Sequence, residues 1–339
     1  MLVQVNGRYL VQRVTGVQRY AREIVARLGD RVSVIAPRSA AKGMRGHLWE
    51  QAVLPCRLRR GLLWSPSATG PLAVRSQVVT IHDCAFFDRP EGFTQTFAAW
   101  YRCLVPRLAR QARRILTVSE FSRQRICEVC RVPAERVVVI PNGVESGWTR
   151  ATSEQIAAAR ERLNLPRPFV LCAGSLEPRK NLRRLLAAWR ALGPAKEGLE
   201  LVLAGAEGHV FQRAGLGDLP GDVRLVGYVS DADLRALFSA AEAFVFPSLY
   251  EGFGLPVLEA LACGTPVVCS RGTSLPEVAG DAAVYVDPEN VESIAAGIAQ
   301  LLENRALRDD LSRRGPARAT PFTWDAAAAQ TWEALRTAL

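Results

Sequence analysis

Short apolar runs alternate with helical segments along nearly the whole chain. In the first half we expect strands at 2–5, 32–36, 62–65, 78–82, 115–119 and 137–141, with helices at 16–28, 93–113 and 120–130. The second half repeats the pattern with strands at 169–173, 199–204, 223–226, 243–247, 266–270 and 283–286, and with helices at 182–192, 232–241, 255–263 and 291–303. Strands that alternate with helices of these lengths form parallel sheets covered by helices. The sequence therefore predicts an α/β fold.

The chain is long enough for two domains. It has 339 residues, of which 49% are hydrophobic and 22% charged, and such a length exceeds one ordinary globular domain. Turn-forming residues at 141–147 follow the last strand of the first half, so we place the hinge near 145–155. We expect doubly wound, Rossmann-like domains at 1–150 and 151–321, followed by an amphipathic helix at 322–339.

Residues 246–259 combine the end of an apolar run, a glycine-rich turn and the start of a helix. Gly252 and Gly254 allow a sharp turn and a close approach to a ligand, and Pro256 fits a first helical turn. The unpaired N–H groups at such a helix start favour an anion, typically phosphate. Glu251 in the loop and Glu259 one turn into the helix can face the same pocket, which favours a ligand with hydroxyls. The alternative is an ordinary turn of a parallel sheet.

A second loop, at 174–181, delivers two cations to the start of the next helix. Arg179 and Lys180 suit the diphosphate of a leaving group. The alternative is a solvated helix start, but cations at that end oppose the helix dipole unless an anion joins them. In the first half, His82 and Asp83 follow an apolar run, so we expect them at the edge where parallel sheets bind ligands.

Residues 246–269 resemble the Glu-x7-Glu signature of the retaining glycosyltransferases of family 4, and the likeness extends over nearly the whole chain. The resemblance implies the GT-B fold, in which two Rossmann-like domains face each other and a C-terminal helix crosses back to the first. It implies that 1–150 binds the acceptor, that 151–321 binds a nucleotide-sugar donor, and that 322–339 is the crossing helix.

The same resemblance implies roles for individual residues. The implied catalytic residues are His82, Arg179, Lys180 and Glu251, with His82 near the reacting carbon and Glu251 facing the sugar ring. The implied donor-binding residues are Gly16, Asp83, Gly174, Ser175, Val229, Ser248, Tyr250, Gly252, Phe253, Gly254, Leu255 and Glu259. Among these, Glu259 would accept hydrogen bonds from the ribose hydroxyls, and Val229 would line the base pocket. Many family members carry Arg where this chain has Ser175.

The expected activity is a retaining transfer of a hexose from a nucleotide diphosphate sugar to a lipid-linked or polysaccharide-precursor acceptor. Residues 80–83 and 177–181 resemble bacterial members that transfer mannose, which favours GDP-mannose, with a UDP-sugar as the alternative donor. We expect no further cofactor. Asp231 and Asp233 spell the acidic triplet that holds a metal in another glycosyltransferase fold, but Ser230 and Asp233 fit a helix cap, so we expect no metal site.

Three other classes of function stay open. A nucleotide-sugar epimerase shares the architecture and needs no acceptor. A dehydrogenase needs a complete dinucleotide fingerprint, and neither Gly205-x2-Gly208 nor Gly215-x-Gly217 has the spacing directly between a strand and a helix. A non-enzymatic sugar-nucleotide-binding module would not need the acids and cations of the two loops.

The charge is divided unevenly between the two halves. Residues 1–150 hold 24 Lys and Arg against 10 Asp and Glu, a net charge of +14, whereas 151–339 hold 19 against 23, a net charge of −4. No nucleic-acid-binding motif accompanies the basic half, so an anionic membrane surface or a phosphorylated acceptor fits better. The amphipathic, arginine-rich segment at 97–114 either rests on lipid or packs on the first sheet, and we leave both interpretations open.

No run approaches the ~20 apolar residues that cross a bilayer, and the start of the chain lacks a basic region followed by an apolar core. We therefore expect a cytoplasmic protein, with the inner face of the cell membrane as an alternative location. The eight cysteines are interpreted as buried thiols. Cys127 and Cys130 have metal-ligand spacing, but no second pair or nearby histidine completes a tetrahedral set, so packing is the favoured role.

Overall fold

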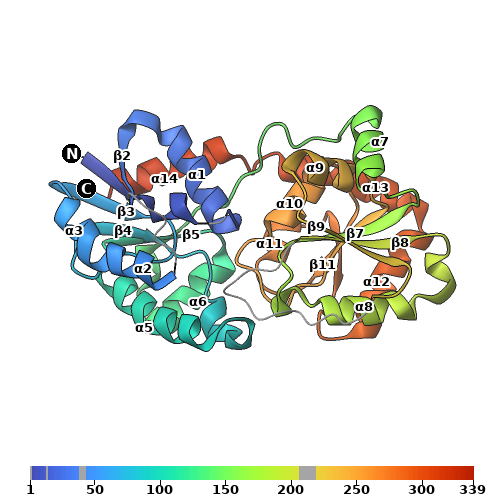
Figure 1. Ribbon diagram of the computed structural model, residues 1–339, viewed down its shortest axis with the longest axis horizontal. Helices are drawn as coiled ribbons and strands as arrows, with labels where there is room; N and C mark the ends of the chain where they lie inside the picture. The colour runs from blue at the N-terminus through green and yellow to red at the C-terminus, as the bar shows by residue number, and fades with distance from the viewer. Residues whose placement is uncertain (1, 13, 38–42, 206–218) are drawn as a thin grey trace. The chain divides into compact units, whose positions relative to one another are not determined.

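The computed structural model describes residues 2–12, 14–37, 43–205 and 219–339 (Figure 1). Its contacts divide the chain into two compact units. Unit 1 comprises Met1–Asp88, Gln95–Gly143 and Phe322–Leu339, and unit 2 comprises Arg89–Thr94 and Val144–Pro321. The division falls at Gly143 instead of within the hinge placed at 145–155, because Trp148 packs its ring 6.0 Å from Phe238 and Ala151 N–H donates to Ser239 Oγ at 2.9 Å.

Unit 1 is built on a sheet of six parallel strands in the order β2-β1-β3-β4-β5-β6. These strands are β1 Leu2–Asn6, β2 Val32–Ile35, β3 Gly61–Ser65, β4 Gln77–Thr80, β5 Arg114–Thr117 and β6 Val137–Val139. The α-helices are α1 Gly16–Leu28, α2 Gly43–Leu48, α3 Leu54–Arg57, α4 Ala85–Asp88, α5 Gln95–Gln111, α6 Glu120–Cys130 and α14 Trp324–Arg336. Figure 1 shows α1 and α14 on one face of this sheet and α5 and α6 on the other.

Unit 2 has the same architecture, with six parallel strands in the order β12-β11-β10-β7-β8-β9. The strands are β7 Phe169–Ala173, β8 Glu200–Ala204, β9 Val223–Gly227, β10 Ala243–Phe246, β11 Val267–Ser270 and β12 Ala283–Val286. The α-helices are α7 Ser153–Arg162, α8 Leu182–Ala191, α9 Asp231–Ala240, α10 Leu255–Ala262, α11 Leu275–Ala279, α12 Val291–Glu303 and α13 Arg305–Ala319. In Figure 1, α8 and α12 cover one face of this sheet and α9, α10 and α13 the other.

The predicted α/β class is therefore confirmed, and every strand that the sequence predicts is present with ends within a few residues. The central strands are buried along their length, as β7, β8, β10 and β11 show, which is why they appear in the sequence as continuous apolar runs. Two long helices were missed, α7 and α13. Each has few buried residues, three in α13 and one in α7, so neither has an apolar stripe to detect.

The last helix, α14, belongs to unit 1 and packs against α1. Trp324 at its start is buried, and its ring lies 6.4 Å from the ring of Tyr20 in α1. Arg27 of α1 donates to the carboxylate of Asp325 at 2.7 Å, and Arg31 lies over the Trp332 ring. The end of the chain thus returns to cover the surface of the first helix.

Helix α5 contains most of the segment left open between lipid contact and packing. Leu104, Val105 and Leu108 on its apolar side are buried within unit 1. Arg102 donates to the carbonyl oxygens of Phe86 and Phe87. The apolar stripe is therefore occupied by packing within the unit. Across the part of the chain that is described, no helix is both long and apolar enough to cross a bilayer.

The prediction that all eight cysteines are buried is wrong for three of them. Cys56 and Cys103 are exposed and Cys127 is half-buried, whereas the others are buried, and all are free thiols. These three lie on helix faces that the apolar pattern around them does not bury. Cys130 fits the packing role: it sits at the end of α6, and burial raises the pKa of its thiol to about 12.

Candidate functional site

Two loops meet at the carboxyl edge of the unit 2 sheet. One follows β7 and spans 174–181, and the other follows β10 and spans 247–254. Because β7 and β10 are neighbouring parallel strands, both loops leave the sheet at the same edge. Leu249 N–H donates to the Arg179 carbonyl at 2.8 Å, and Asn181 Nδ2 donates to the Pro247 carbonyl at 3.0 Å. These bonds hold the two loops together as one surface.

Gly254 fixes the start of helix α10. Its backbone has φ +103°, a left-handed conformation that residues with a Cβ rarely adopt, and a Cβ built there would lie 2.4 Å from Leu275 Cδ2. Leu255 and Pro256 open the helix. Val257 N–H and Leu258 N–H donate to the Gly254 carbonyl at 3.0 and 3.2 Å and Pro256 has no N–H, so Leu255 N–H is the donor that the first turn leaves open. The turn and helix start predicted from the sequence therefore have the geometry that suits an anion.

Glu251 is the centre of the charged contacts in these loops. Its Oε1 accepts hydrogen bonds from Lys180 Nζ at 2.5 Å and from Ser248 Oγ at 2.6 Å, and its Oε2 accepts from Arg179 Nη1 at 3.2 Å. Glu251 and Lys180 are both only 6% exposed. The ammonium of Lys180 also lies 4.7 Å from the centre of the Phe246 ring, a favourable cation–π position.

Arg179 has a second carboxylate on its other side. Its Nη2 lies 2.8 Å from Glu177 Oε1, and its Nη1 donates to the Tyr250 carbonyl at 3.0 Å. Glu177 is fully buried and also accepts a hydrogen bond from Ser175 Oγ at 2.5 Å. Arg179 is thus fixed from both loops, and its guanidinium has little freedom to turn.

The two cations keep Glu251 ionised. Burial by itself raises the pKa of this carboxyl, but the charges of Lys180 and then Arg179, with hydrogen bonds from Lys180 and Ser248, hold its pKa below the usual range. The ligand-free cluster contains two cations, Arg179 and Lys180, and two carboxylates, Glu177 and Glu251, which balance in charge. An anionic ligand therefore adds negative charge to a cluster that is neutral without it.

The other residues predicted for the second half lie around this cluster, with one exception. Tyr250, Gly252 and Phe253 are buried in the loop after β10, and Gly174 with Ser175 opens the loop after β7. Glu259 lies one turn into α10 and is 6% exposed. Val229 follows β9, which β8 separates from β7, so the structure does not place it beside the cations.

The predicted site residues of the first half belong to unit 1. Gly16 is the first residue of α1, which Thr15 and Gln18 cap. His82 follows β4 and is 8% exposed; its Nε2 donates to the Pro66 carbonyl at 2.9 Å, and its ring packs edge-on against Tyr20 with centroids 4.7 Å apart. Burial lowers the pKa of His82, with the Pro66 contact and Asp83 acting in the opposite direction. The imidazole is therefore neutral at pH 7, and Nδ1 carries its lone pair.

Asp83 has a local role. Its Oδ1 accepts a hydrogen bond from Ala85 N–H at 3.0 Å, which closes a turn of the Asx type ahead of the short helix α4. This contact occupies one carboxylate oxygen and accounts for the carboxyl type at this position without a ligand. A donor-binding role for Asp83 stays a prediction.

Sequence reasoning missed the groups that hold the loops in place. Ser274 Oγ donates to the Glu251 carbonyl at 3.0 Å, and Ser270 Oγ donates to the Ser248 carbonyl at 2.7 Å. Both serines come from the end of β11 and the segment after it, and β11 is the other neighbour of β10. Single serines carry no periodic signal, so only the order of the strands could have pointed to them.

A buried charged cluster in unit 1 was also missed. Arg8 Nη1 lies 3.2 Å from Glu50 Oε2 and donates to Thr69 Oγ1 at 2.9 Å, while Asn6 Nδ2 donates to Glu50 Oε1 at 2.6 Å. His47 packs on Arg8 and accepts from Trp100 Nε1 at 3.0 Å. These side chains join the carboxyl ends of β1 and β3 to the segment around α2.

The helix cap that we expected at Ser230 and Asp233, in place of a metal site, is confirmed. Ser230 is the N-cap of α9, its Oγ accepts from Asp233 N–H at 3.1 Å, and the Asp233 carboxylate pairs with Arg162. Within residues 2–12, 14–37, 43–205 and 219–339, no three side chains of His, Cys, Asp or Glu are grouped as metal ligands. Of the two incomplete glycine motifs, Gly205 directly follows β8, and Gly208, Gly215 and Gly217 lie outside the described residues.

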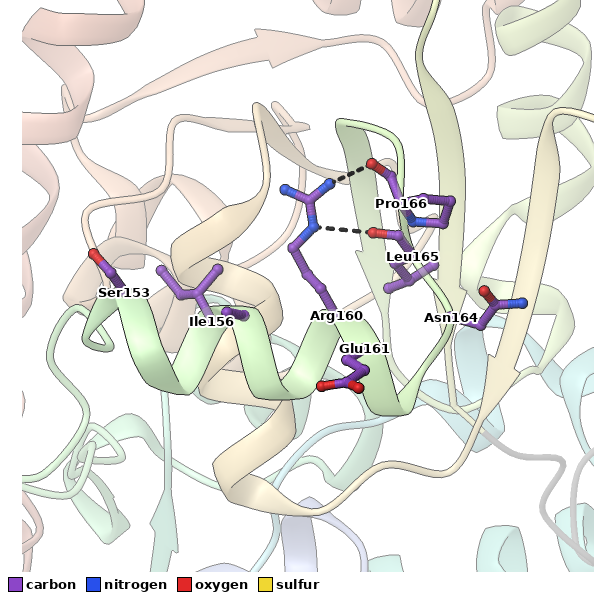
Figure 2. A pocket seen from close by; sticks show the side chains of 8 residues that line it. Ser153, Ile156, Arg160, Glu161, Asn164, Leu165 and Pro166 are labelled. Carbon is purple, nitrogen blue, oxygen red and sulfur yellow. Dashed lines mark hydrogen bonds between the residues drawn. The ribbon is translucent and has the colours of Figure 1, made fainter.

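The hollow that Figure 2 shows lies elsewhere in unit 2, along α7. It has a volume of about 530 Å³ and is lined by Ser153, Ile156, Ala157, Arg160, Glu161, Asn164, Leu165 and Pro166. Arg160 there donates to the carbonyl oxygens of Leu165 and Pro166. None of the predicted site residues lines this hollow, so we assign the site to the charged loops.

Solved structures share the fold of the whole chain. Sucrose-phosphate synthase from Thermosynechococcus elongatus superposes with a TM-score of 0.77 at 20% identity, covering 99% of this chain and 98% of that one. Anabaena Alr3699/HepE, solved in complex with UDP and glucose, gives a TM-score of 0.77 at 19% identity and covers 99% of both chains. These likenesses establish the GT-B fold that the sequence predicted.

Sequence relatives define the class. O-antigen chain mannosyltransferase B of Escherichia coli is 37% identical over 273 residues, which are 78% of this chain and 71% of the relative. The MMP alpha-(1->4)-mannosyltransferase of Mycolicibacterium hassiacum is 34% identical over 234 residues, 66% of this chain and 54% of the relative. The serotype-specific mannosyltransferase WbdA of Escherichia coli is 32% identical over 227 residues, which are 62% of this chain and 27% of the relative.

The fold, the loops and these relatives together define a glycosyltransferase. Residues 63–147 match the family described as Glycosyltransferase Family 4, and residues 154–318 match Glycosyl transferases group 1. The chain belongs to glycosyltransferase family 4. The predicted family and the predicted enzyme class are thereby confirmed.

Proposed function

We propose that this protein transfers mannose from GDP-mannose to a glycan acceptor, with retention of the anomeric configuration. The observation that carries the proposal is the pair of cations, half-buried Arg179 and buried Lys180, set beside Glu251 and the start of α10. The names of the relatives, which are mannosyltransferases, favour mannose as the sugar. GDP follows as the carrier that the sequence favours, and a UDP-sugar is the alternative donor.

The chemistry follows from the charge that develops on the departing nucleoside diphosphate. Arg179, which Glu177 and the Tyr250 carbonyl hold, and the start of α10 are fixed before the donor arrives, so they stabilise this charge with little reorganisation. Lys180 adds its charge when Glu251 turns to the hexose. Glu251 would accept hydrogen bonds from the hydroxyls of the hexose, and Glu259 those from the ribose hydroxyls. Retention by attack on the face that the leaving group occupies fits this arrangement, because a leaving phosphate oxygen can accept the proton of the acceptor hydroxyl. NMR analysis of the product anomer tests this step.

The proposal includes no metal and no cofactor besides the donor. Two fixed cations and a helix start supply the positive charge that a divalent metal gives to a leaving diphosphate in other enzymes. We expect transfer to continue at its normal rate after dialysis against EDTA. A loss of activity that Mg²⁺ or Mn²⁺ restores would contradict this part of the proposal.

The acceptor is proposed to be a lipid-linked or polysaccharide-precursor glycan at an anionic membrane surface. The net charge of +14 over residues 1–150 supports this proposal, together with the relative that is named for the O-antigen chain. Since the apolar stripe of α5 is buried, the contact would be electrostatic and would weaken with salt. Flotation with anionic and with neutral liposomes, each at low and high salt, tests it; equal flotation with both lipids would refute it.

The test of the function is release of nucleoside diphosphate that depends on an added acceptor. We expect release from GDP-mannose with a mannosylated glycan acceptor and little release without it. An epimerase would interconvert a UDP-sugar with no acceptor present, and a binding module would bind the donor without turnover. A parallel series with GDP-, UDP-, ADP- and TDP-sugars decides the base, and failure of every donor would refute the proposal.

A further inference from the structure

The contacts of Glu251 in the ligand-free protein indicate a further property of the donor site, and this inference rests on the proposed function. We propose that Glu251 makes the site favour the sugar-bearing donor over the bare nucleoside diphosphate that remains after transfer. It does so by competing with the diphosphate for Lys180 and Arg179, and by exchanging that ion pair for the hydroxyls of the hexose when a hexose is present.

Lys180 shows that the competition is direct. Glu251 Oε1, at 2.5 Å, is the carboxylate oxygen that the structure pairs with its ammonium. The ammonium is buried and packs over the Phe246 ring on another side. An ammonium has three donors, so a phosphate oxygen can approach Lys180 beside Glu251 Oε1, but two anions that share one buried cation repel each other, and this repulsion favours displacement of the Glu251 carboxylate.

The displaced carboxylate is the source of the selectivity. Glu251 is 6% exposed, and Ser248 Oγ is the hydrogen-bond donor that it keeps when it leaves both cations. A buried carboxylate that loses its ion-pair partners is strongly destabilised unless new donors replace them. The hydroxyls of a bound hexose are such donors, whereas a nucleoside diphosphate without its sugar offers none at that position. After transfer, Glu251 regains Lys180 and Arg179 and assists release of the product.

Arg179 does not depend on Glu251 for its position. It keeps the Glu177 carboxylate at 2.8 Å and the Tyr250 carbonyl at 3.0 Å. Glu177 is fully buried and bonded to Ser175, so it stays with the guanidinium during the exchange. The two carboxylates thus have different roles. Glu177 holds Arg179 in place, and Glu251 releases both cations when the hexose binds.

The test compares the affinities of two variants for GDP and for GDP-mannose by calorimetry. In Glu251→Gln the competing charge is gone, so we expect the dissociation constant of GDP to fall about tenfold or more. The dissociation constant of GDP-mannose should fall less, so that the preference for the donor shrinks. The matched control is Glu200→Gln, which neutralises another buried carboxylate of unit 2, paired with Arg224 at 3.1 Å at the opposite end of the sheet. It should leave both affinities unchanged.

A double-mutant cycle separates competition from a structural effect. Combined with Lys180→Met, the Glu251→Gln change should tighten GDP binding much less than it does alone, because the main cation is absent. Should Glu251→Gln fail to fold, Glu251→Asp withdraws the carboxylate by one methylene and should shift GDP affinity in the same direction by a smaller factor. Unchanged or weaker GDP binding, or equal gains for GDP and donor, would overturn the inference. If the wild-type protein binds neither ligand, the proposed function itself fails.

Discussion

Gly254→Ala tests whether the left-handed turn before α10 positions the donor site. An alanine at φ +103° is destabilised by about 1–2 kcal/mol relative to an allowed conformation. Its Cβ would meet Leu275 Cδ2 at 2.4 Å, and Leu275 is fully buried, so the side chain can yield only by repacking at about 1–3 kcal/mol. The sum is about 3 kcal/mol, which corresponds to a fall of about 6–12 °C in Tm for a unit of this size.

The assay is differential scanning calorimetry together with GDP titration. GDP affinity should also fall, because the helix start has to shift to admit the methyl group. Gly272→Ala is the matched control: nothing lies within 4 Å of a Cβ at that position, so stability should stay equal or rise by about 0.4–1 kcal/mol. If Gly254→Ala melted like Gly272→Ala and bound GDP normally, the assigned geometry of the turn would be wrong.

Three further predictions concern single side chains. Lys180→Ala should lower kcat/KM about 30- to 900-fold, equivalent to ~2–4 kcal/mol of lost transition-state stabilisation, and near-normal turnover would remove Lys180 from the catalytic role. Ser230→Ala removes the cap that Asp233 N–H donates to, so it should cost about 1 kcal/mol in calorimetry while kcat/KM stays unchanged; altered kinetics would show that α9 matters to the site. The pKa of Glu251 is lower in the folded than in the unfolded protein. Its ionised form therefore stabilises the fold at pH values above the ordinary carboxyl pKa of about 4.3, and this stabilisation is lost as the pH falls through the folded pKa. The stability difference between wild type and Glu251→Gln in urea unfolding should therefore shrink below about pH 4, and a constant difference would contradict the ion pairs.

The sequence predicted the fold because the strands are buried along their length. β7 and β10 are continuous apolar runs that end in glycine or proline, and such runs are visible without a structure. The polar helix α13 was not predicted, because only Leu311, Gly315 and Ala319 of its residues are buried and they form no apolar stripe. Local apolar pattern therefore decides what a single sequence reveals about secondary structure.

The site was predictable in its residue types and less so in its contacts. Arg179, Lys180 and Glu251 were expected as phosphate and sugar contacts, but their mutual ion pairs depend on β7 and β10 being neighbours, and strand order cannot be read from periodicity. Glu177 gave no separate signal, although it is the fully buried partner of Arg179. The cluster of Arg8 and Glu50 was missed for the same reason, because its members lie 42 positions apart in the sequence.

Unit 1 is assembled from segments that come before and after unit 2 in the sequence, and this has a consequence for its biosynthesis. Trp324 buries its ring against Tyr20, so the surface of α1 stays uncovered on the ribosome until translation has passed the last helix of unit 2. A nascent chain with its first sheet already formed would expose this apolar patch to chaperones for the whole time that unit 2 is being made. A premature stop codon just before Trp324 would therefore harm unit 1, although the residues that it removes are made after all of unit 2.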